Sequence, residues 1–572
     1  MTVTIRILTL LLLWSLGSAF PLSAFAEEET SEPYGTVRLS RISLIEGEVL
    51  LQRGDDEEWV AASVNMPLRP HDKLWATDDA RAEVEFDNGI TVRLAENSNL
   101  DLISLEPDWI HLQLTLGVAS FEAKAPFRTG AQRPFLEIDT PQATAQLTRS
   151  TAFRADVAED GSTVITVRNG EVELSRDEGP VVIAADQRVS IEGGDSPDYL
   201  VDSAGEPDEW DRWNKDRDAQ RAAAESHEHL PADTEMGVSE LNTYGGWNQI
   251  QPYGWVWAPR VGVGWAPYHI GRWVWVEPWG WTWVSYEPWG WLPYHYGRWI
   301  VVGTIGWVWV PGPTLGIWTP GCVRFFYGPT WVSWVPLGPH EIYYHNKPPE
   351  HRHFDSNLIN AHVPGATTVI SRRQFVTGTP EEERFNPPKD PIRSGRVAVG
   401  PPPVVPTRAS LHPAPDKVVT ADRLPPPTIN RPVVYTRPPS APPPLFEHRV
   451  KEIHSVVTKG LPPAAAAPSL PARRPPAVEG GPAVHRDIIV REVKPSQSSV
   501  LPKPTPRLPE KRVEPGREPK TRQPSPPKSI KLPRPPSAPS APGTSVGGTR
   551  QVRPLYKVPP QSRTQPPVVS PR

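Results

Sequence analysis

The chain has 572 residues and a net charge of −5, but most of its 74 Pro follow Asn346. Residues 391–572 carry 30 Lys and Arg against 10 Asp and Glu, so an acidic N-terminal part is joined to a basic C-terminal part. The single Cys322 excludes an intramolecular disulfide framework. This charge asymmetry favours self-association or an anionic partner, and solubility is the simplest alternative.

Residues 1–26 have the pattern of a secretory signal peptide. Arg6 supplies the positive charge, residues 7–20 form an apolar core, and the small residues Ala24 and Ala26 mark a cleavage site. We therefore expect export to the periplasm or cell envelope of a bacterium, with an uncleaved membrane anchor as the alternative. No later stretch of 18 or more apolar residues occurs, so no transmembrane segment is expected after cleavage.

Residues 34–194 alternate apolar and polar side chains in short runs that are separated by turn residues. Asn88-Gly89 lies between two such runs, and residues 165–174 repeat the arrangement around Asn169-Gly170. Asn-Gly is the preferred turn of a tight β-hairpin. The pattern predicts an all-β, sandwich-like domain. Its two histidines, His71 and His111, have no partners at metal spacing, so we expect no metal, no cofactor and no catalytic residues there.

Several spaced motifs of this domain resemble the FecR domain family. They are residues 87–92, residues 140–143 followed by 151–153, residues 167–172 and residues 185–187. Ser150 stands where the family usually has Gly. The resemblance implies an extracytoplasmic β domain of bacterial envelopes. FecR-type regulators carry an anti-sigma segment and a membrane span before this domain, for which 33 residues leave no room, so a module reused for envelope binding is expected.

A helical connector is predicted at residues 205–228. Pro207 and the neighbouring acidic residues suit a helix N-terminus, and Trp210 and Trp213 share one face at a spacing of three. We expect these two indoles to dock the helix onto a neighbouring domain, with an exposed lever as the alternative.

Residues 240–345 form a predicted Trp-rich domain, which holds 17 of the 23 Trp and is extended by residues 346–385. A short Gly-Trp-x-Trp unit recurs every 26 residues, starting at Tyr253, Trp279 and Ile305. Alternate residues of an extended strand point to opposite faces, so the pattern predicts stacked β-hairpins that share one core. The region is similar to Trp- and Tyr-rich repeats found after FecR-like domains in exported bacterial proteins of unknown function.

Most of these indoles must be buried. Each aromatic side chain can bury roughly 150–250 Å², and soluble proteins rarely expose one apolar patch above roughly 600 Å². A minority can remain outside as a binding platform. On geometry, the expected ligand contacts are Trp279, Trp281, Trp283, Arg272 and Arg298. Such a strip suits the faces of sugar rings and equally suits a proline-rich peptide. The repeated His269 and His295 have no acidic partners in register, so no metal is predicted.

Residues 391–572 are predicted to be a disordered, Pro-rich, basic tail. Its charge would draw it to anionic polymers of the envelope, and export makes nucleic acid an unexpected partner. A passive spacer is the alternative.

Together these features predict a non-enzymatic exported protein that binds cell-wall or surface glycan through its β domains. The alternative is a scaffold or signalling component that recognises Pro-rich protein segments, its own tail included. A glycan hydrolase would need two facing carboxylates. The repeats offer only Glu277 and Glu287, both in turns.

Overall fold

A computed structural model describes most of the chain before residue 460. The described residues are 38–124, 135–175, 179–192, 198–232, 234–312, 315–344, 358–380, 385–459 and 491–492. The chain divides into two compact units, Met1–Ser498 and Ser499–Arg572, and every described residue belongs to the first. The predicted signal peptide and the tail beyond residue 459, apart from residues 491–492, lie outside the described residues.

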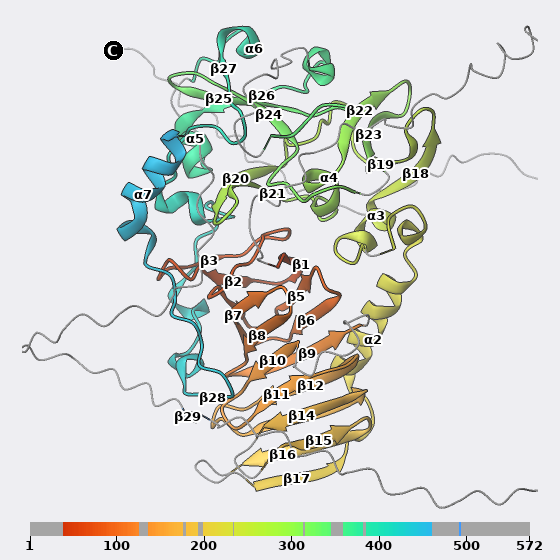
Figure 1. Cartoon of the computed structure of the whole chain (residues 1–572), viewed down its shortest axis with the longest axis vertical. Coiled ribbons are helices and arrows are strands. Elements are labelled where there is room, and N and C mark those ends of the chain that lie inside the picture. Colours follow the sequence, from red (N-terminus) through yellow and green to blue (C-terminus); the bar gives the residue numbers. More distant parts are fainter. Residues whose placement is uncertain are drawn as a thin grey trace, which may run out of the picture. The chain divides into compact units, whose positions relative to one another are not determined.

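Residues 40–203, the N-terminal β domain, form two sheets packed face to face (Figure 1). The first sheet has the order β1 (Ser40–Glu46), β5 (Arg81–Phe86), β6 (Ile90–Leu94), β9 (Gly117–Ala123), β12 (Thr151–Val157), β13 (Thr163–Asn169), β16 (Gln187–Glu192) and β17 (Asp198–Ser203). The second has the order β15 (Val181–Ala184), β14 (Glu171–Ser175), β11 (Thr144–Leu147), β10 (Leu136–Asp139), β8 (Trp109–Gln113), β7 (Ser98–Glu106), β4 (Lys73–Ala76), β2 (Val49–Gln52) and β3 (Trp59–Ala61).

The predicted all-β, sandwich-like class is confirmed, and one predicted turn is wrong. Gly89 has a φ of 78° and joins β5 to its antiparallel partner β6, as predicted. Gly170 also has a positive φ, but β13 and β14 lie in different sheets. Asn169-Gly170 therefore turns a corner between the two sheets instead of closing a hairpin. Both turns place Gly at a positive φ, so the turn residues alone cannot separate them.

The predicted connector forms helix α2 (Glu209–Ala222), which Asp208 caps with a capping box. Trp210 and Trp213 stack with ring centroids 5.0 Å apart, and the Trp210 indole donates to Ser120 Oγ of the N-terminal β domain (2.8 Å). Arg217 of the same helix pairs with the buried Glu83 at 2.9 Å. Arg81 of β5 lies 5.0 Å from the ring centre of Trp213, so the helix is docked through its two indoles, as the sequence predicts. The 3-10 helix η1 (Glu225–Glu228) and helix α3 (Val238–Tyr244) follow.

Residues 245–377, the aromatic domain, are built from four β-hairpins in three sheets. The hairpins are β18 (Gly245–Ile250) with β19 (Gly254–Pro259), β20 (Gly271–Val276) with β21 (Gly280–Ser285), β22 (Arg298–Val302) with β23 (Gly306–Val310), and β24 (Val323–Tyr327) with β25 (Trp331–Pro336). The remaining elements are α4 (Trp291–His295), η2 (Ile359–His362), β26 (Thr368–Ser371) and α5 (Arg372–Thr377).

The predicted hairpins are present, but they do not form one continuous stack. The first and third hairpins join in a four-stranded sheet where Trp257 meets Trp309, whereas β20 and β21 form a sheet of their own. Indoles from different sheets meet in one core, for example Trp273 of β20 and Trp334 of β25, whose ring centroids are 5.9 Å apart. Of the 17 Trp, 13 are buried, which agrees with the surface-area argument.

Residues 385–459, called the strap here, run from the aromatic domain along the N-terminal β domain (Figure 1). The strap contains α6 (Pro391–Ser394), β27 (Arg396–Val397), η3 (Arg408–Leu411), η4 (Ala421–Arg423), η5 (Pro427–Asn430), β28 (Val434–Tyr435) and α7 (Phe446–Lys459). Beyond it, the two-residue strand β29 (Arg491–Glu492) pairs with β28.

The prediction of disorder from residue 391 is therefore wrong for residues 391–459. Amino-acid composition predicts only whether a segment has enough apolar residues to form a core of its own. The strap instead buries several of its apolar side chains against the two domains, among them Val404 (3% exposed), Leu411 (0%), Ile429 (3%) and Phe446 (3%).

Candidate binding site

The centre of the candidate site is the contact between the aromatic domain and residues 403–404 of the strap. Trp281, on β21, donates its indole Nε1–H to the backbone oxygen of Val404 (2.8 Å). Arg372, at the start of α5, donates to the backbone oxygen of Pro403 (2.9 Å). Proline has no backbone N–H, so carbonyl oxygens are the main polar groups of such a segment. Indole and guanidinium donors match that chemistry.

Arg272, on β20, holds the next part of the strap. Its guanidinium donates to the backbone oxygens of Thr377 (3.1 Å), Val376 (3.2 Å) and Ala409 (3.4 Å), and so links the end of α5 to η3. Burial lowers the pKa of Arg272 to about 10. Tyr286 donates its hydroxyl to the backbone oxygen of Pro413 (2.8 Å), which extends the row of carbonyl contacts.

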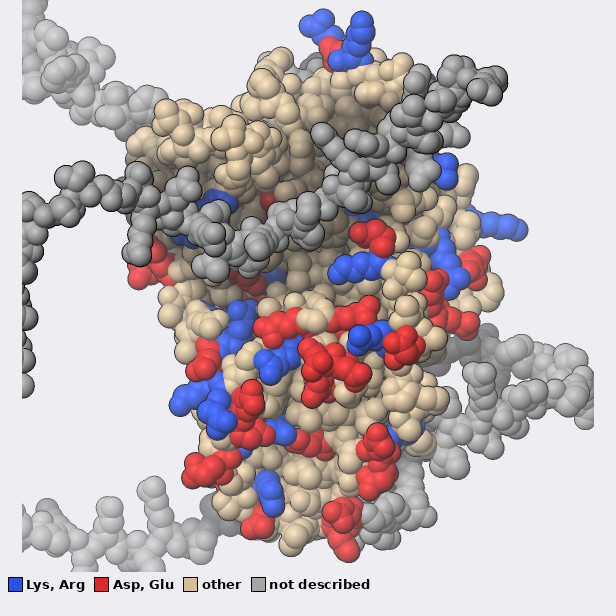
Figure 2. Space-filling model, turned by 180° about the vertical axis from the view of Figure 1, so that it is seen from behind, with Lys and Arg blue, Asp and Glu red and all other residues tan. Residues whose placement is uncertain are grey.

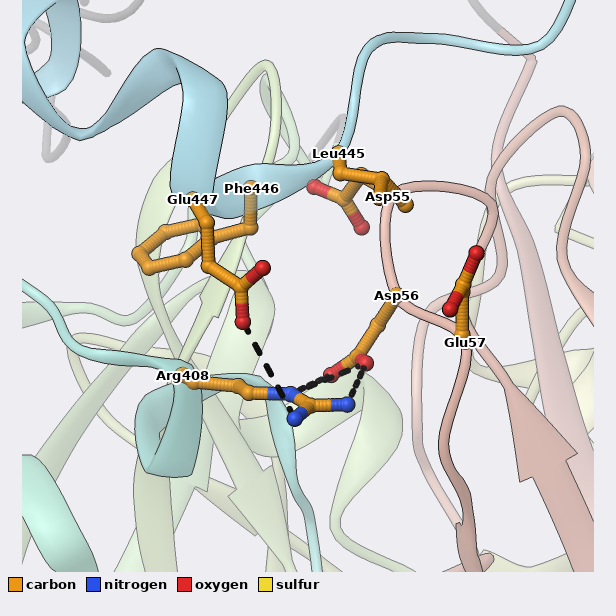
Figure 3. A pocket seen from close by; sticks show the side chains of 7 residues that line it. All are labelled: Asp55, Asp56, Glu57, Arg408, Leu445, Phe446 and Glu447. Atoms are coloured by element: carbon orange, nitrogen blue, oxygen red, sulfur yellow. Dashed lines mark hydrogen bonds and ion pairs between the residues drawn. The ribbon is translucent and has the colours of Figure 1, made fainter.

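The strap is also held by an acidic loop of the N-terminal β domain, residues 55–58 between β2 and β3. Arg408 Nε lies 3.0 Å from Asp56, and Figure 3 shows the two side chains in direct contact at the wall of a small cavity of about 80 Å³. Burial alone would raise the pKa of the Asp56 carboxyl, but His412 and Arg408 hold it well below its usual range. Phe446, at the start of α7, donates its backbone N–H to the backbone oxygen of Asp55 (2.8 Å). The cavity is too small for a sugar ring, and three of its lining side chains, Asp55, Asp56 and Arg408, already form ion pairs.

A second part of the strap binds β10 and β11. Val434 donates its N–H to the backbone oxygen of Thr140 (3.0 Å) and accepts from the Thr144 hydroxyl (2.8 Å). The Thr436 hydroxyl donates to the carboxylate of Glu137. The strap therefore crosses both domains. Its backbone oxygens accept hydrogen bonds from the aromatic domain, and its own donors meet carboxylates and backbone oxygens of the N-terminal β domain.

The structure buries all five predicted ligand contacts, and this corrects their assignment to an exposed platform. Trp279 is 3% exposed, Trp281 and Trp283 are 1% exposed, Arg272 is 7% exposed and Arg298 is 9% exposed. Trp281 and Arg272 contact the strap, whereas the other three lie in the core of the aromatic domain. The alternating pattern correctly places the indoles on one face, but that face points inward because three sheets converge on it.

Sequence reasoning missed Asp56, Arg372, Tyr286 and Arg408. The acidic loop could have been found from sequence. Residues 55–58 are four consecutive acids, and the C-terminal part of the chain is basic, so a contact between the two could be expected. Nothing in the local pattern identifies Arg372 or Tyr286.

The prediction that His111 has no partners is also wrong. Parallel pairing of β8 with β10 sets His111 opposite Glu137, and His111 Nε2 lies 2.6 Å from Asp139 Oδ2. Ligand atoms of all three lie within 4.8 Å of one another, and all three side chains are buried. Burial raises the pKa of Asp139 to about 6. Gln146 and Thr436 donate to Glu137, so the cluster is a hydrogen-bonded network in which the acids already have protein donors.

Comparisons with known proteins agree with the two resemblances. Residues 72–173 match the family described as FecR protein. The chain carries an FecR domain. Residues 238–341 match a family of unknown function (DUF6600), which covers the hairpins of the aromatic domain. The predicted order of an FecR-like domain and a Trp-rich region is confirmed.

Two crystal structures of a candidate anti-sigma factor from Parabacteroides distasonis, at 1.65 and 2.50 Å resolution, are similar to part of this chain. Each match has 16% identity and a TM-score of 0.20, and covers 23% of this chain and 59% of the other. The match thus spans less than two thirds of those relatives. No curated protein sequence matches the chain. Within the described residues, no helix has the length and apolar character needed to cross a membrane.

Proposed function

We propose that this chain is a non-enzymatic scaffold or signalling protein of the bacterial envelope, whose two β domains bind proline-rich segments. The observation that carries the proposal is the set of donors from Trp281, Arg372 and Arg272 to backbone oxygens of the strap. In this structure the protein's own strap is the ligand. The FecR family match and the predicted signal peptide support the envelope location.

The surface chemistry is consistent with protein recognition. Figure 2 shows Lys, Arg, Asp and Glu mixed over the N-terminal β domain on that face, and a largely uncharged surface over the aromatic domain. Envelope glycan is the other ligand class predicted from the sequence. It would need indoles on the surface, and Trp255, at 43%, is the only exposed tryptophan among the described residues. The contacts therefore favour proline-rich protein segments.

The test is Trp281→Phe in the full chain. Phe keeps an aromatic ring at the position but removes the indole N–H, and leaves the carbonyl of Val404 without this donor. An unsatisfied buried carbonyl costs about 1–3 kcal/mol, which raises the local opening of the strap by about fivefold to 150-fold. We expect amides of residues 404–411 to exchange hydrogen faster by that factor, as measured by mass spectrometry.

Trp275→Phe is the matched control. Trp275 is also 1% exposed and lies 5.7 Å from Trp281, but its Nε1–H has no hydrogen-bond partner among the described residues. It makes a similar cavity without touching the strap carbonyl. Equal exchange rates for the two variants would show that the indole donor does not hold the strap, and the proposal would lose its main support.

A further inference from the structure

A six-residue pattern, Pro-Val-Val-x-x-Arg, occurs three times in the C-terminal part of the chain. The copies are residues 403–408 (Pro-Val-Val-Pro-Thr-Arg), residues 432–437 (Pro-Val-Val-Tyr-Thr-Arg) and residues 567–572 (Pro-Val-Val-Ser-Pro-Arg). The first two lie in the strap. The third lies outside the described residues. Four matching positions at a constant spacing are a more specific signal than high proline content alone.

The two described copies make contacts through the same two positions of the pattern. The first Val of each is buried, with Val404 3% exposed and Val433 6% exposed. The Arg of each meets a group of the N-terminal β domain. Arg408 pairs with Asp56 at 3.0 Å, and the guanidinium of Arg437 lies 4.6 Å from the ring centre of Trp109. The pattern thus has one apolar anchor and one cationic anchor, four residues apart.

Each position of the pattern has a physical role in an extended ligand. Pro restricts the backbone before binding and so lowers the entropy that binding must remove. The Val side chains bury apolar area with little loss of rotamer freedom. Arg supplies a planar fork of donors, which suits a carboxylate and also stacks on an aromatic ring.

The third copy fits the first site better than the second. In the second site, the Thr436 hydroxyl donates to Glu137, and the third copy has Pro571 at that position, which has no hydroxyl. In the first site, the backbone N–H of the corresponding Thr407 donates to Ser410 Oγ of the strap itself (3.1 Å), so Pro571, which has no N–H, loses no contact to Trp281, Arg372 or Asp56. The first site also offers an acidic loop to a segment from a strongly basic part of the chain.

We propose that residues 567–572 of one chain bind in a second copy at the site that holds residues 403–408, through Trp281, Arg372 and Asp56. This inference rests on the proposed function and names its ligand class as Pro-Val-Val-x-x-Arg segments. The strap is covalently attached and therefore competes at a high effective concentration. The segment from the second copy binds well only when the strap contact is weakened.

The test uses the full chain with two substitutions. R408A removes the strap guanidinium from Asp56, and R572A disables the chain's own third copy. Four labelled peptides are titrated by fluorescence anisotropy. They are residues 563–572, the same peptide with R572A, the proline-rich residues 531–540 without the pattern, and the strap residues 399–415. We expect peptide 563–572 to bind at least tenfold tighter than its R572A form and than peptide 531–540. Adding D56N to the chain should remove that difference.

The outcomes separate the two proposals. Equal binding of peptide 563–572, its R572A form and peptide 531–540 would show that the Pro-Val-Val-x-x-Arg pattern is not recognised. Recognition of proline-rich segments in general would still stand. Binding of peptide 399–415 alone would overturn the role of residues 567–572. Binding of none of the four would overturn the proposed function itself. The peptide with R572A needs no folded variant, so the comparison holds even if D56N lowers the stability of the chain.

A second readout is self-association. The R408A chain should form concentration-dependent oligomers in sedimentation velocity, and the chain with both R408A and R572A should stay at the size of the parent. Oligomers of equal size in both variants would contradict the assignment of residues 567–572.

Discussion

Glu287, which follows β21, is a buried carboxyl that should make the stability of the chain depend on pH. It is 7% exposed, accepts a hydrogen bond from Trp265 Nε1 (2.8 Å) and from the Tyr294 hydroxyl, and its backbone oxygen accepts from Asn65 of the N-terminal β domain (2.8 Å). Burial raises its pKa to about 7 against the effect of these donors. The neutral form is thus the one that the folded chain favours.

The direction in which stability changes with pH follows from the pKa of Glu287 in the folded and in the unfolded chain. The unfolded carboxyl has a pKa of 4.5 and the folded one about 7, so the folded chain binds the proton more tightly. This contribution to stability is fully present below pH 4.5, declines between pH 4.5 and 7, and is absent above. Between pH 5 and 8 the loss is about 2.5 kcal/mol for this single group.

Glu287→Gln keeps the shape of the neutral carboxyl and removes the titration. Urea unfolding followed by Trp fluorescence at pH 5 and pH 8 should show that the variant loses about 2.5 kcal/mol less stability than the parent over this interval. Other titrating groups, such as Asp139 with its pKa of about 6, are present in both proteins and cancel in the comparison. Parallel profiles of stability against pH for variant and parent would show that Glu287 does not have a raised pKa in the folded chain.

Three further predictions concern stability and the strap. Glu83→Gln breaks a buried ion-pair cluster and should destabilise the folded chain by about 3–5 kcal/mol in chemical unfolding, whereas a loss below 1 kcal/mol would mean that the cluster relaxes. Gly271→Ala places a Cβ 2.5 Å from the backbone of the neighbouring strand and should lower the melting temperature much more than Gly254→Ala, which has a positive φ but open space. Thr436→Val removes a hydroxyl that donates to Glu137 and should speed amide exchange in residues 433–437, and unchanged exchange would count against this contact.

The N-terminal β domain could be predicted from sequence because its signals are local. Alternation along each strand shows which side chains face a core, and Asn88-Gly89 shows where a strand reverses. The pairing of distant strands is not local. Asn169-Gly170 has the same turn residues, yet only the sheet order shows that it joins two sheets. The meeting of His111 with Glu137 and Asp139 depends on β8 lying beside β10, which neither segment specifies alone.

In the candidate site, too, the sequence predicts a general property but not the individual contacts. The number of indoles and the area of each were enough to predict that most are buried, and 13 of 17 are. The identity of those near a ligand was not predictable, because Trp281 and Trp275 have the same local pattern. Only the packed structure shows that Trp281 donates to Val404 while Trp275 finds no partner.

The sequence by itself determined the all-β class, the FecR resemblance, the hairpins and the burial of most tryptophans. These properties depend on periodicity, turn chemistry and the limited apolar area that a surface can expose. The tertiary structure decided that residues 391–459 are ordered and that Arg408 meets Asp56, 352 positions earlier in the chain. A proline-rich segment with few apolar residues cannot order itself, so its conformation depends on the surfaces that two other domains bring together.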